Sequence, residues 1–349
     1  MTNNYLAVKR MYNQQIIDSR FNQPEDVVTY MVAMQAQDYA GAQWAIGLRM
    51  TNAKNHIIEK ALNEGKILRT HLLRPTWHFV SPADIRWLLT LTAPHIHAAS
   101  VTMNKKFELN DKLFTKSNEI LAKALQNNTQ LTRPEIDNLL KQAGIATNDT
   151  RLSLLLIRAE LDQVICSGAR SGKQFSYVSL DDRAPLTPPL SHEEALAKLA
   201  AGYFNSRGPA TLHDFAYWAG LTITDARIGL ENVKSNLADE VIDGKTYWMS
   251  GDQEINTQQK NKAYLLPMYD EFAIAYKDRN AMVNPLYLTQ AMHVIFDAVI
   301  VVDNQVVGTW RRTIKKNSAD ICLNLFGKLN KTKTTAVEIA SKKYQKFLF

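Results

Sequence analysis

Apolar residues recur at helical spacing through the first part of the chain and predict three short helices. The first is expected over 23–35, because Pro24 and two acidic residues suit its first turn and Asn22 can cap it. Two more are expected over 42–48 and 52–63, with Gly65 as a stop. An extended stretch follows over 67–80 and is interrupted at Pro75. This order of helices and ribbon is that of a winged helix.

The same order returns twice farther along the chain. In the second copy, Thr132 and Glu135 form a capping box before one helix, a second helix follows Thr150, and a ribbon turns over 168–173. A proline-rich linker follows at 185–189. The third copy has helices expected over 193–205, 213–219 and 222–235, and a hairpin over 240–249 with Asp243-Gly244 as a type I′ turn. The three copies share a pattern but no clear sequence identity.

The pattern changes after residue 258. Strand-like runs are expected over 264–272, 296–312 and 321–326, and Asp303-Asn304 is placed to turn the second run into a hairpin. An amphipathic helix over 335–347 closes this part. We therefore predict an α+β fold that is mainly α. It has winged helices at 1–100, 101–184 and 190–255 and a basic, β-rich segment at 256–349.

Composition limits the class of function. At 349 residues, with 46% hydrophobic and 21% charged residues, the chain is expected to be a soluble globular protein of two to four domains. The first residues do not resemble a secretory signal, and no apolar run is long enough to span a membrane. The two cysteines lie far apart and the eight histidines are scattered, which argues against a metal site. These features predict a cytoplasmic protein with no metal and no membrane partner.

Charge points to a polyanionic partner. The formal charge is +7, and residues 305–349 hold ten Lys or Arg against two acidic residues. Such a basic region suits nucleic acid, although a solvated lysine-rich face is the alternative. Basic residues in the predicted ribbons and hairpin tips are the best candidates for phosphate contacts. They are Arg69, Arg74, Arg170, Lys173, Arg311 and Arg312.

Candidate chemistry is concentrated in Gln35-Ala36-Gln37, near the end of the first predicted helix. On a continuous helix, residues two apart point about 200° apart and cannot serve one site. The two amides therefore cooperate only if the helix ends or distorts between Met34 and Asp38. Otherwise they cap the helix or bond to neighbouring backbone. A second polar pair, Asp270-Glu271, would face opposite sides of a predicted strand and could not flank one bond as glycosidase carboxylates do.

A set of sequence blocks runs in order through nearly the whole chain. The blocks are 34–37 with 44–45 and 48–49, then 72–80, 159–162 through 173–175, 266–267, 270–271, 276–279 and 307–312. In these blocks the chain resembles the bacterial AlkZ-like winged-helix DNA glycosylases, which include the enzyme that unhooks interstrand crosslinks. The resemblance implies tandem winged-helix domains around a concave DNA-binding face and a C-terminal β-barrel-like domain. One departure is Trp77, where relatives often carry leucine.

The family's catalytic signature, Gln–apolar–Gln, implies catalytic roles for Gln35 and Gln37, with Asp38 and His78 as possible support. The two amides would position a water at C1′ of a nucleotide whose N7- or N3-alkylated purine is cationic and leaves readily. The resemblance implies alkylated double-stranded DNA as partner and no cofactor or metal. Three dissimilar winged units in one chain suit a monomer. A non-catalytic winged-helix DNA-binding protein or transcriptional regulator is the alternative.

Overall fold

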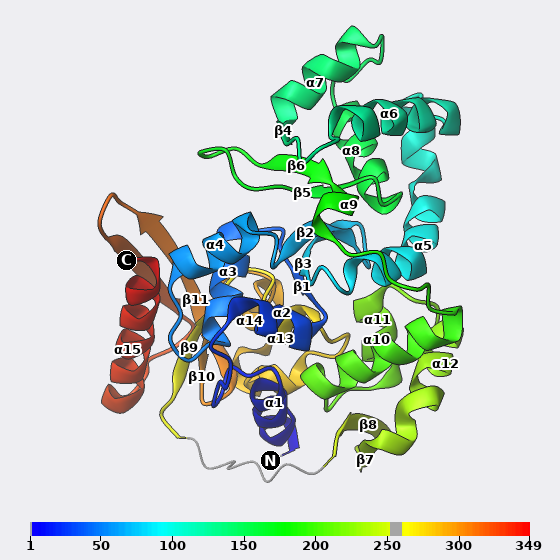
Figure 1. The fold of residues 1–349 in the computed structure, drawn as a ribbon. Coiled ribbons are helices and arrows are strands. Elements are labelled where there is room, and N and C mark those ends of the chain that lie inside the picture. Colours follow the sequence, from blue (N-terminus) through cyan, green and yellow to red (C-terminus); the bar gives the residue numbers. More distant parts are fainter. Residues whose placement is uncertain (1, 252–259) are drawn as a thin grey trace. The chain divides into compact units, whose positions relative to one another are not determined.

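The computed structural model describes residues 2–251 and 260–349 (Figure 1). They form two compact units, one made of residues up to 59 together with 196–349, and the other of 60–195. About half of the chain is helical and about a fifth lies in strands. In the described part, no helix is both long enough and apolar enough to cross a membrane. The division into four sequence segments at 100, 184 and 255 stays a prediction.

The N-terminal part of the first unit is mainly helical. Its elements are α1 (Thr2–Asn13), α2 (Pro24–Met31), β1 (Ala33–Gln35), α3 (Tyr39–Leu48) and α4 (Asn55–Asn63), the last of which runs into the second unit. Every residue of α3 from Gly41 to Leu48 is buried, as expected of a helix that is apolar on all sides. The predicted helix over 23–35 is wrong at its end, because α2 ends at Met31 and a strand follows. The sequence pattern did not predict α1.

Three helices and a hairpin continue the first unit, in the predicted order. They are α10 (His192–Arg207), α11 (Leu212–Ala219) and α12 (Ile223–Val233), followed by β7 (Leu237–Ile242) and β8 (Lys245–Ser250). Asp243 and Gly244 both have positive φ, 50° and 75°, which confirms the predicted type I′ turn. Tyr203, Phe204 and Phe215 pack together with Trp218 at ring distances of 5.1–5.4 Å.

An open four-stranded sheet completes the first unit, in the order β12-β11-β10-β9. The predicted barrel-like closure is therefore wrong. Asp303 and Asn304 turn β10 into β11 at φ 48° and 70°, as predicted. The aromatic rings of Trp44 on α3, Trp310 on β11 and Tyr344 on α15 pack together, with Tyr344 5.1 and 4.9 Å from the other two. The strands are β9 (Ala263–Leu266), β10 (Val299–Val302), β11 (Gln305–Ile314) and β12 (Ala319–Leu325), and the helices are α13 (Glu271–Ile274), α14 (Leu288–His293) and α15 (Lys331–Leu348), with 3-10 turns at Asn280–Met282 and Pro285–Tyr287.

The second unit combines two small sheets with helices. The predicted ribbon over 67–80 is the hairpin of β2 (Leu68–Leu72) and β3 (Thr76–Val80), interrupted as expected at Pro75. Short strands in the order β4-β6-β5 form another sheet, and the Thr132–Glu135 capping box is present. The other elements are α5 (Ile85–Lys106), α6 (Asp111–Ala124), β4 (Leu131–Thr132), α7 (Arg133–Gln142), α8 (Arg151–Leu161), β5 (Ile165–Ser167), β6 (Ser176–Ser179) and α9 (Leu180–Arg183).

Candidate active site

The backbone changes direction immediately before the Gln-Ala-Gln segment. Val32 follows the last residue of α2 with φ 62° and ψ −54°, a conformation that a β-branched residue rarely adopts. Such strain costs about 1–3 kcal/mol and persists only where the surrounding structure enforces it. Gly202 on α10 provides the space, because a Cβ there would lie 2.3 Å from Val32 Cγ2. The helix thus ends three residues before the range in which the sequence required a break.

Beyond the break, Gln35 and Gln37 lie on non-helical backbone. Gln35 ends β1, and α3 begins only at Tyr39. β1 does not continue past Gln35, and Gln37 lies in a bend between the strand and α3. Ala36 between them is fully buried, whereas Gln35 is half-buried and Gln37 is exposed. The arrangement removes the helical geometry that would have kept the two amides apart.

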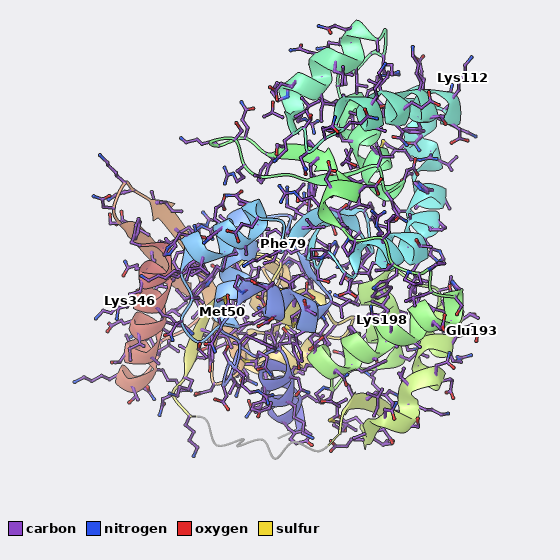
Figure 2. The ribbon with its side chains drawn as sticks, in the orientation of Figure 1. Met50, Phe79, Lys112, Glu193, Lys198 and Lys346 are labelled. Carbon is purple, nitrogen blue, oxygen red and sulfur yellow. The ribbon has the colours of Figure 1, made fainter. Side chains whose placement is uncertain are left out.

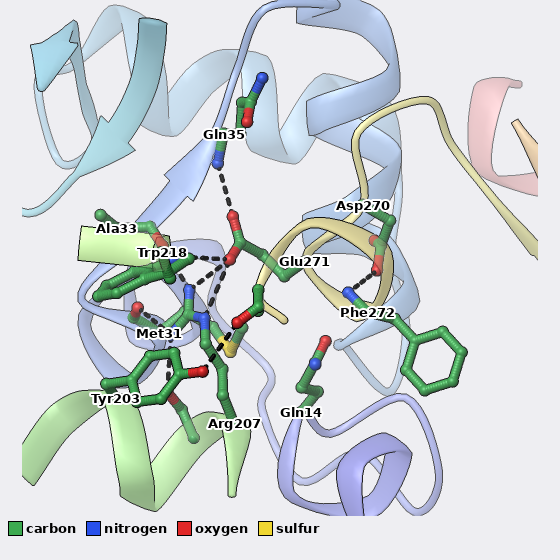
Figure 3. Close-up of polar contacts among 12 residues, drawn as sticks. Gln14, Met31, Ala33, Gln35, Tyr203, Arg207, Trp218, Asp270, Glu271 and Phe272 are labelled. Carbon is green, nitrogen blue, oxygen red and sulfur yellow. Dashed lines mark hydrogen bonds and ion pairs between the residues drawn. The ribbon is translucent and has the colours of Figure 1, made fainter. Parts of the chain in front are cut away.

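One buried guanidinium binds the backbone on both sides of Val32. Arg207, on the last turn of α10, donates from Nη1 to the Met31 carbonyl at 2.9 Å and from Nη2 to the Ala33 carbonyl at 2.7 Å (Figure 3). The two carbonyls flank Val32, so the guanidinium holds the backbone on each side of the break. Arg207 is completely buried, so this contact is shielded from water.

Glu271 links this arginine to the catalytic candidate. Its Oε2 accepts hydrogen bonds from Arg207 Nε and Nη2 at 2.9 and 2.8 Å and from Trp218 Nε1 at 3.0 Å. Its Oε1 accepts from the backbone N–H of Gln35 at 2.8 Å. Figure 3 shows the Gln35 side chain extending away from Glu271, so the carboxylate holds the backbone and leaves the amide for other contacts. Sequence reasoning missed the roles of Arg207 and Trp218, and no local motif signals them.

The neighbouring Asp270 belongs to a second buried ion pair. Arg49 contacts its two carboxylate oxygens from Nη1 and Nη2, each at 2.9 Å, and Asp270 also caps the backbone N–H of Phe272 at 2.9 Å. The predicted strand over 264–272 is wrong after Leu266, because Asp270 begins α13 instead. We still do not expect Asp270 and Glu271 to flank one bond, but the reason is different. Each carboxylate neutralises a separate arginine.

A tyrosine joins the two ion pairs. The Tyr276 hydroxyl donates to the Arg207 carbonyl at 2.7 Å and accepts from Gln14 Nε2 at 2.9 Å, while Gln14 Oε1 accepts from Arg49 Nη2 at 2.8 Å. Burial raises the pKa of Tyr276 to about 12, so the hydroxyl stays protonated and keeps donating. The backbone under the Gln-Ala-Gln segment is thus held by one continuous polar network.

Asp38 and Arg312, predicted separately from the sequence, lie together. Asp38 precedes α3 and its carboxylate faces Arg312 of β11, with Nη2 3.3 Å from Oδ2 and 3.5 Å from Oδ1. A Cβ at Gly41 would lie 2.4 Å from Asp38 Oδ2, so the glycine leaves room for this carboxylate. Arg311, the next residue of β11, is exposed. One cation therefore lies next to the Gln-Ala-Gln segment.

The remaining predicted residues belong to the second unit. His78 on β3 is fully buried, and its Nδ1 contacts the Thr76 carbonyl at 2.9 Å. Arg69 is 7% exposed and its guanidinium lies 3.9 Å from the ring centre of Trp77 and 4.8 Å from that of Phe175. A phosphate contact by Arg69 would require it to leave this stack. Roles for His78 and Arg69 in function stay predictions.

The hairpin tip between β5 and β6 keeps its predicted cations at the surface. Arg170 donates from Nη2 to the Lys173 carbonyl at 2.9 Å and lies 5.1 Å from the Phe175 ring centre. Lys173 is exposed, and Gly172 between them has φ 61°, which suits glycine. Arg74, in the turn between β2 and β3, is half-buried. Among the described residues, no group of three or more His, Cys, Asp or Glu could hold a metal ion.

Gly202→Ala is expected to destabilise the protein by about 1–3 kcal/mol, because the new methyl group would displace the stiff side chain of Val32. Helix propensity alone would give the opposite sign, since alanine is better than glycine inside a helix by about 0.5–1 kcal/mol. Urea unfolding of the two proteins measures the difference. A more stable variant would show that the Val32 conformation is not constrained by α10.

The family model described as DNA glycosylase AlkZ-like matches residues 28–347. The solved structure of the Streptomyces sahachiroi DNA glycosylase AlkZ superposes with a TM-score of 0.79, covering 99% of this chain and 96% of that one at 18% identity. At this identity the likeness shows a common fold. A search of curated proteins finds no match.

Proposed function

The chain belongs to the AlkZ-like DNA glycosylase family, and we propose that it hydrolyses the N-glycosidic bond of cationic N7- or N3-alkylated purines in double-stranded DNA. Interstrand crosslinks through such purines are within the proposed substrate class. Family membership supports a role in DNA repair. The observation that carries the finer proposal is the end of α2 at Met31, which puts Gln35 and Gln37 on non-helical backbone anchored by Arg207 and Glu271.

The proposed chemistry needs no acid. Alkylation at N7 or N3 puts a positive charge on the purine ring, so the base leaves as a neutral molecule without being protonated. The enzyme then has to place a water at C1′ and tolerate the oxocarbenium character of the sugar. An amide can accept a hydrogen bond from the water through its oxygen and donate one to the water oxygen through its nitrogen. The proton that the water loses on bonding to C1′ passes to bulk solvent. Two amides on one face fix the water's position and orientation, which lowers the entropic cost of attack.

Asp38 would support this site from beside Gln37. Its carboxylate lies next to the segment and is balanced by Arg312. A negative charge near C1′ would favour the cationic transition state, and Arg312 would limit that charge in the free enzyme. His78, Arg74, Arg170, Lys173 and Arg311 remain proposed contacts to the site or to DNA phosphates, which would make binding salt-dependent. The winged-helix assignment of the helix–hairpin segments belongs to the same proposal.

Substrate range is the direct test. We expect the purified protein to release N7-methylguanine from a duplex and to release uracil more slowly by about a thousandfold or more, about 4 kcal/mol in barrier height. Neutral bases depart far less readily, and two amides cannot protonate them. Released bases are separated by chromatography, with protein-free incubation correcting for spontaneous depurination and unmodified duplex as control. Comparable rates on uracil would contradict the proposed mechanism.

The alternative is a winged-helix DNA-binding protein or regulator that does no chemistry. Tight binding to alkylated duplex without base release would favour it. A regulator that reads a palindrome is expected to dimerise, whereas the proposed glycosylase acts as a monomer. The proposal also requires hydrolysis by water alone, so borohydride should trap no covalent protein–DNA adduct. A trapped adduct would replace the water mechanism with an amine nucleophile.

A further inference from the structure

A basic groove lies between the loop after α3 and the last turns of α15. It has a volume of about 560 Å³. Trp44 and Phe347 line it and are 1% and 2% exposed, so they form its apolar base. Ile339 lines it too and is 63% exposed. The charged lining residues are all lysines, namely Lys54, Lys342, Lys343 and Lys346.

One lysine of this groove bonds to main-chain oxygens. Lys54 donates from Nζ to the main-chain oxygens of Lys346 and Phe349, each at 2.7 Å. Within the described part of the chain, the three lysines of α15 in the groove have no ion-pair or side-chain hydrogen-bond partner. Lys342, Lys343 and Lys346 are exposed, so their ammonium groups are accessible to an anionic ligand.

The groove connects to the candidate active site through packed residues of the same unit. Arg312, which pairs with Asp38, lies 5.9 Å from the ring centre of Tyr344, and Tyr344 stacks on Phe347 at 6.4 Å. On the other side, α3 runs from Asp38 toward Trp44. A helical rise of 1.5 Å per residue puts the groove about 10–15 Å from Gln37. Along one DNA strand, this spans about three or four phosphates at 3.4 Å each.

We propose that this groove binds the phosphate backbone of the substrate duplex, three or four nucleotides from the base on which Gln35 and Gln37 act. The inference rests on the proposed function and extends its DNA contacts beyond the hairpins. Four ammonium groups can reach successive phosphates, while the exposed side chain of Ile339 can contact the sugars between them. An acidic peptide could also pair with the lysines. The distance between the groove and Gln37 favours a DNA strand that contacts both the groove and the candidate active site.

Salt-dependent binding tests the proposal directly. Lys343→Gln/Lys346→Gln removes two charges at exposed positions of α15, and Lys112→Gln/Lys123→Gln removes two from exposed positions of α6 as a matched control. Figure 2 labels one lysine of each pair, Lys346 and Lys112. Affinity for an undamaged duplex of about 20 base pairs is measured by fluorescence anisotropy from about 50 to about 300 mM KCl. We expect the groove variant to bind about tenfold or more weakly and its log–log salt slope to fall by about 1.8 in magnitude. The control should match the wild type.

Two results would overturn the proposal. One is a groove variant whose affinity and salt slope equal those of the wild type. The other is an equal loss of DNA affinity in the groove and control variants, which would show that the effect comes from net charge alone. Saturable binding of an acidic peptide that is lost only in the groove variant, with DNA binding intact, would assign the surface to a protein partner. The affinity measurement uses undamaged duplex and does not depend on catalysis. A protein that releases no base would therefore contradict the proposed function but leave the test of the groove valid.

The spacing has its own test. Duplexes with N7-methylguanine placed about two or about eight base pairs from one end differ in whether the strand reaches the groove. Wild-type protein should bind the longer arm about tenfold more tightly on one side of the lesion only, and Lys343→Gln/Lys346→Gln should lose that difference. An arm effect that is the same in the variant would contradict the proposed position.

Discussion

Replacing Gln35 and Gln37 together by alanine is expected to lower the single-turnover rate of N7-methylguanine release by about 10²–10⁴-fold. Both side chains would hold the attacking water, so the double variant loses its position and its orientation at once. Each single variant should lose most of this factor, because residues that act as a unit are not additive. The rate is measured with enzyme in excess over DNA, so that substrate binding does not limit it.

The unfolding midpoint of the double variant separates an effect on chemistry from an effect on folding. Glu271 holds Gln35 through its backbone N–H, and alanine keeps that contact. Gln37 is exposed, so its truncation leaves no cavity. Gln23→Ala is a matched control, because Gln23 is exposed and its side chain makes no capping bond to α2. Full activity in the double variant, with an unchanged unfolding midpoint, would rule out the proposed water site.

Sequence reasoning predicted the condition under which the two amides could cooperate, but not its cause. The i, i+2 spacing of Gln35 and Gln37 demands a break in the helix, and the structure has one. No residue in the segment signals it, since Val32 is neither glycine nor proline. The cause lies far along the chain, in the space left by Gly202 and the two hydrogen bonds of Arg207. A local pattern cannot contain such information.

The elements that sequence did predict are those with local causes. The I′ turn at Asp243-Gly244 and the Thr132 capping box depend on a few adjacent residues, and both are present. Closure of the last sheet depends instead on pairing between distant strands, and that prediction is wrong. The strand through Asp270 is wrong because a carboxylate caps α13 while also pairing with Arg49. Polar residues used for burial and capping look like site residues in a sequence.

Glu271→Ala is expected to destabilise the protein by about 3–5 kcal/mol, because it leaves Arg207 buried without its counter-charge. Glu271→Gln should cost less, since an amide oxygen can still accept from the Gln35 N–H. Both changes are measured as shifts in the urea unfolding curve. Stability close to that of wild type in Glu271→Ala would mean that the carboxylate contributes no net stabilisation.

A paired substitution separates stability from positioning. Arg207→Met/Glu271→Leu removes both buried charges, and apolar replacement of such a pair is often neutral for stability. Here two carbonyls and the Gln35 N–H lose their partners, so we expect the double variant to regain only part of the stability lost by Glu271→Ala. Base release, assayed where the variant is fully folded, should stay at least about tenfold below wild type in the single-turnover rate, with DNA affinity little changed. A folded double variant with the wild-type rate would show that Arg207 and Glu271 stabilise the unit without positioning Gln35.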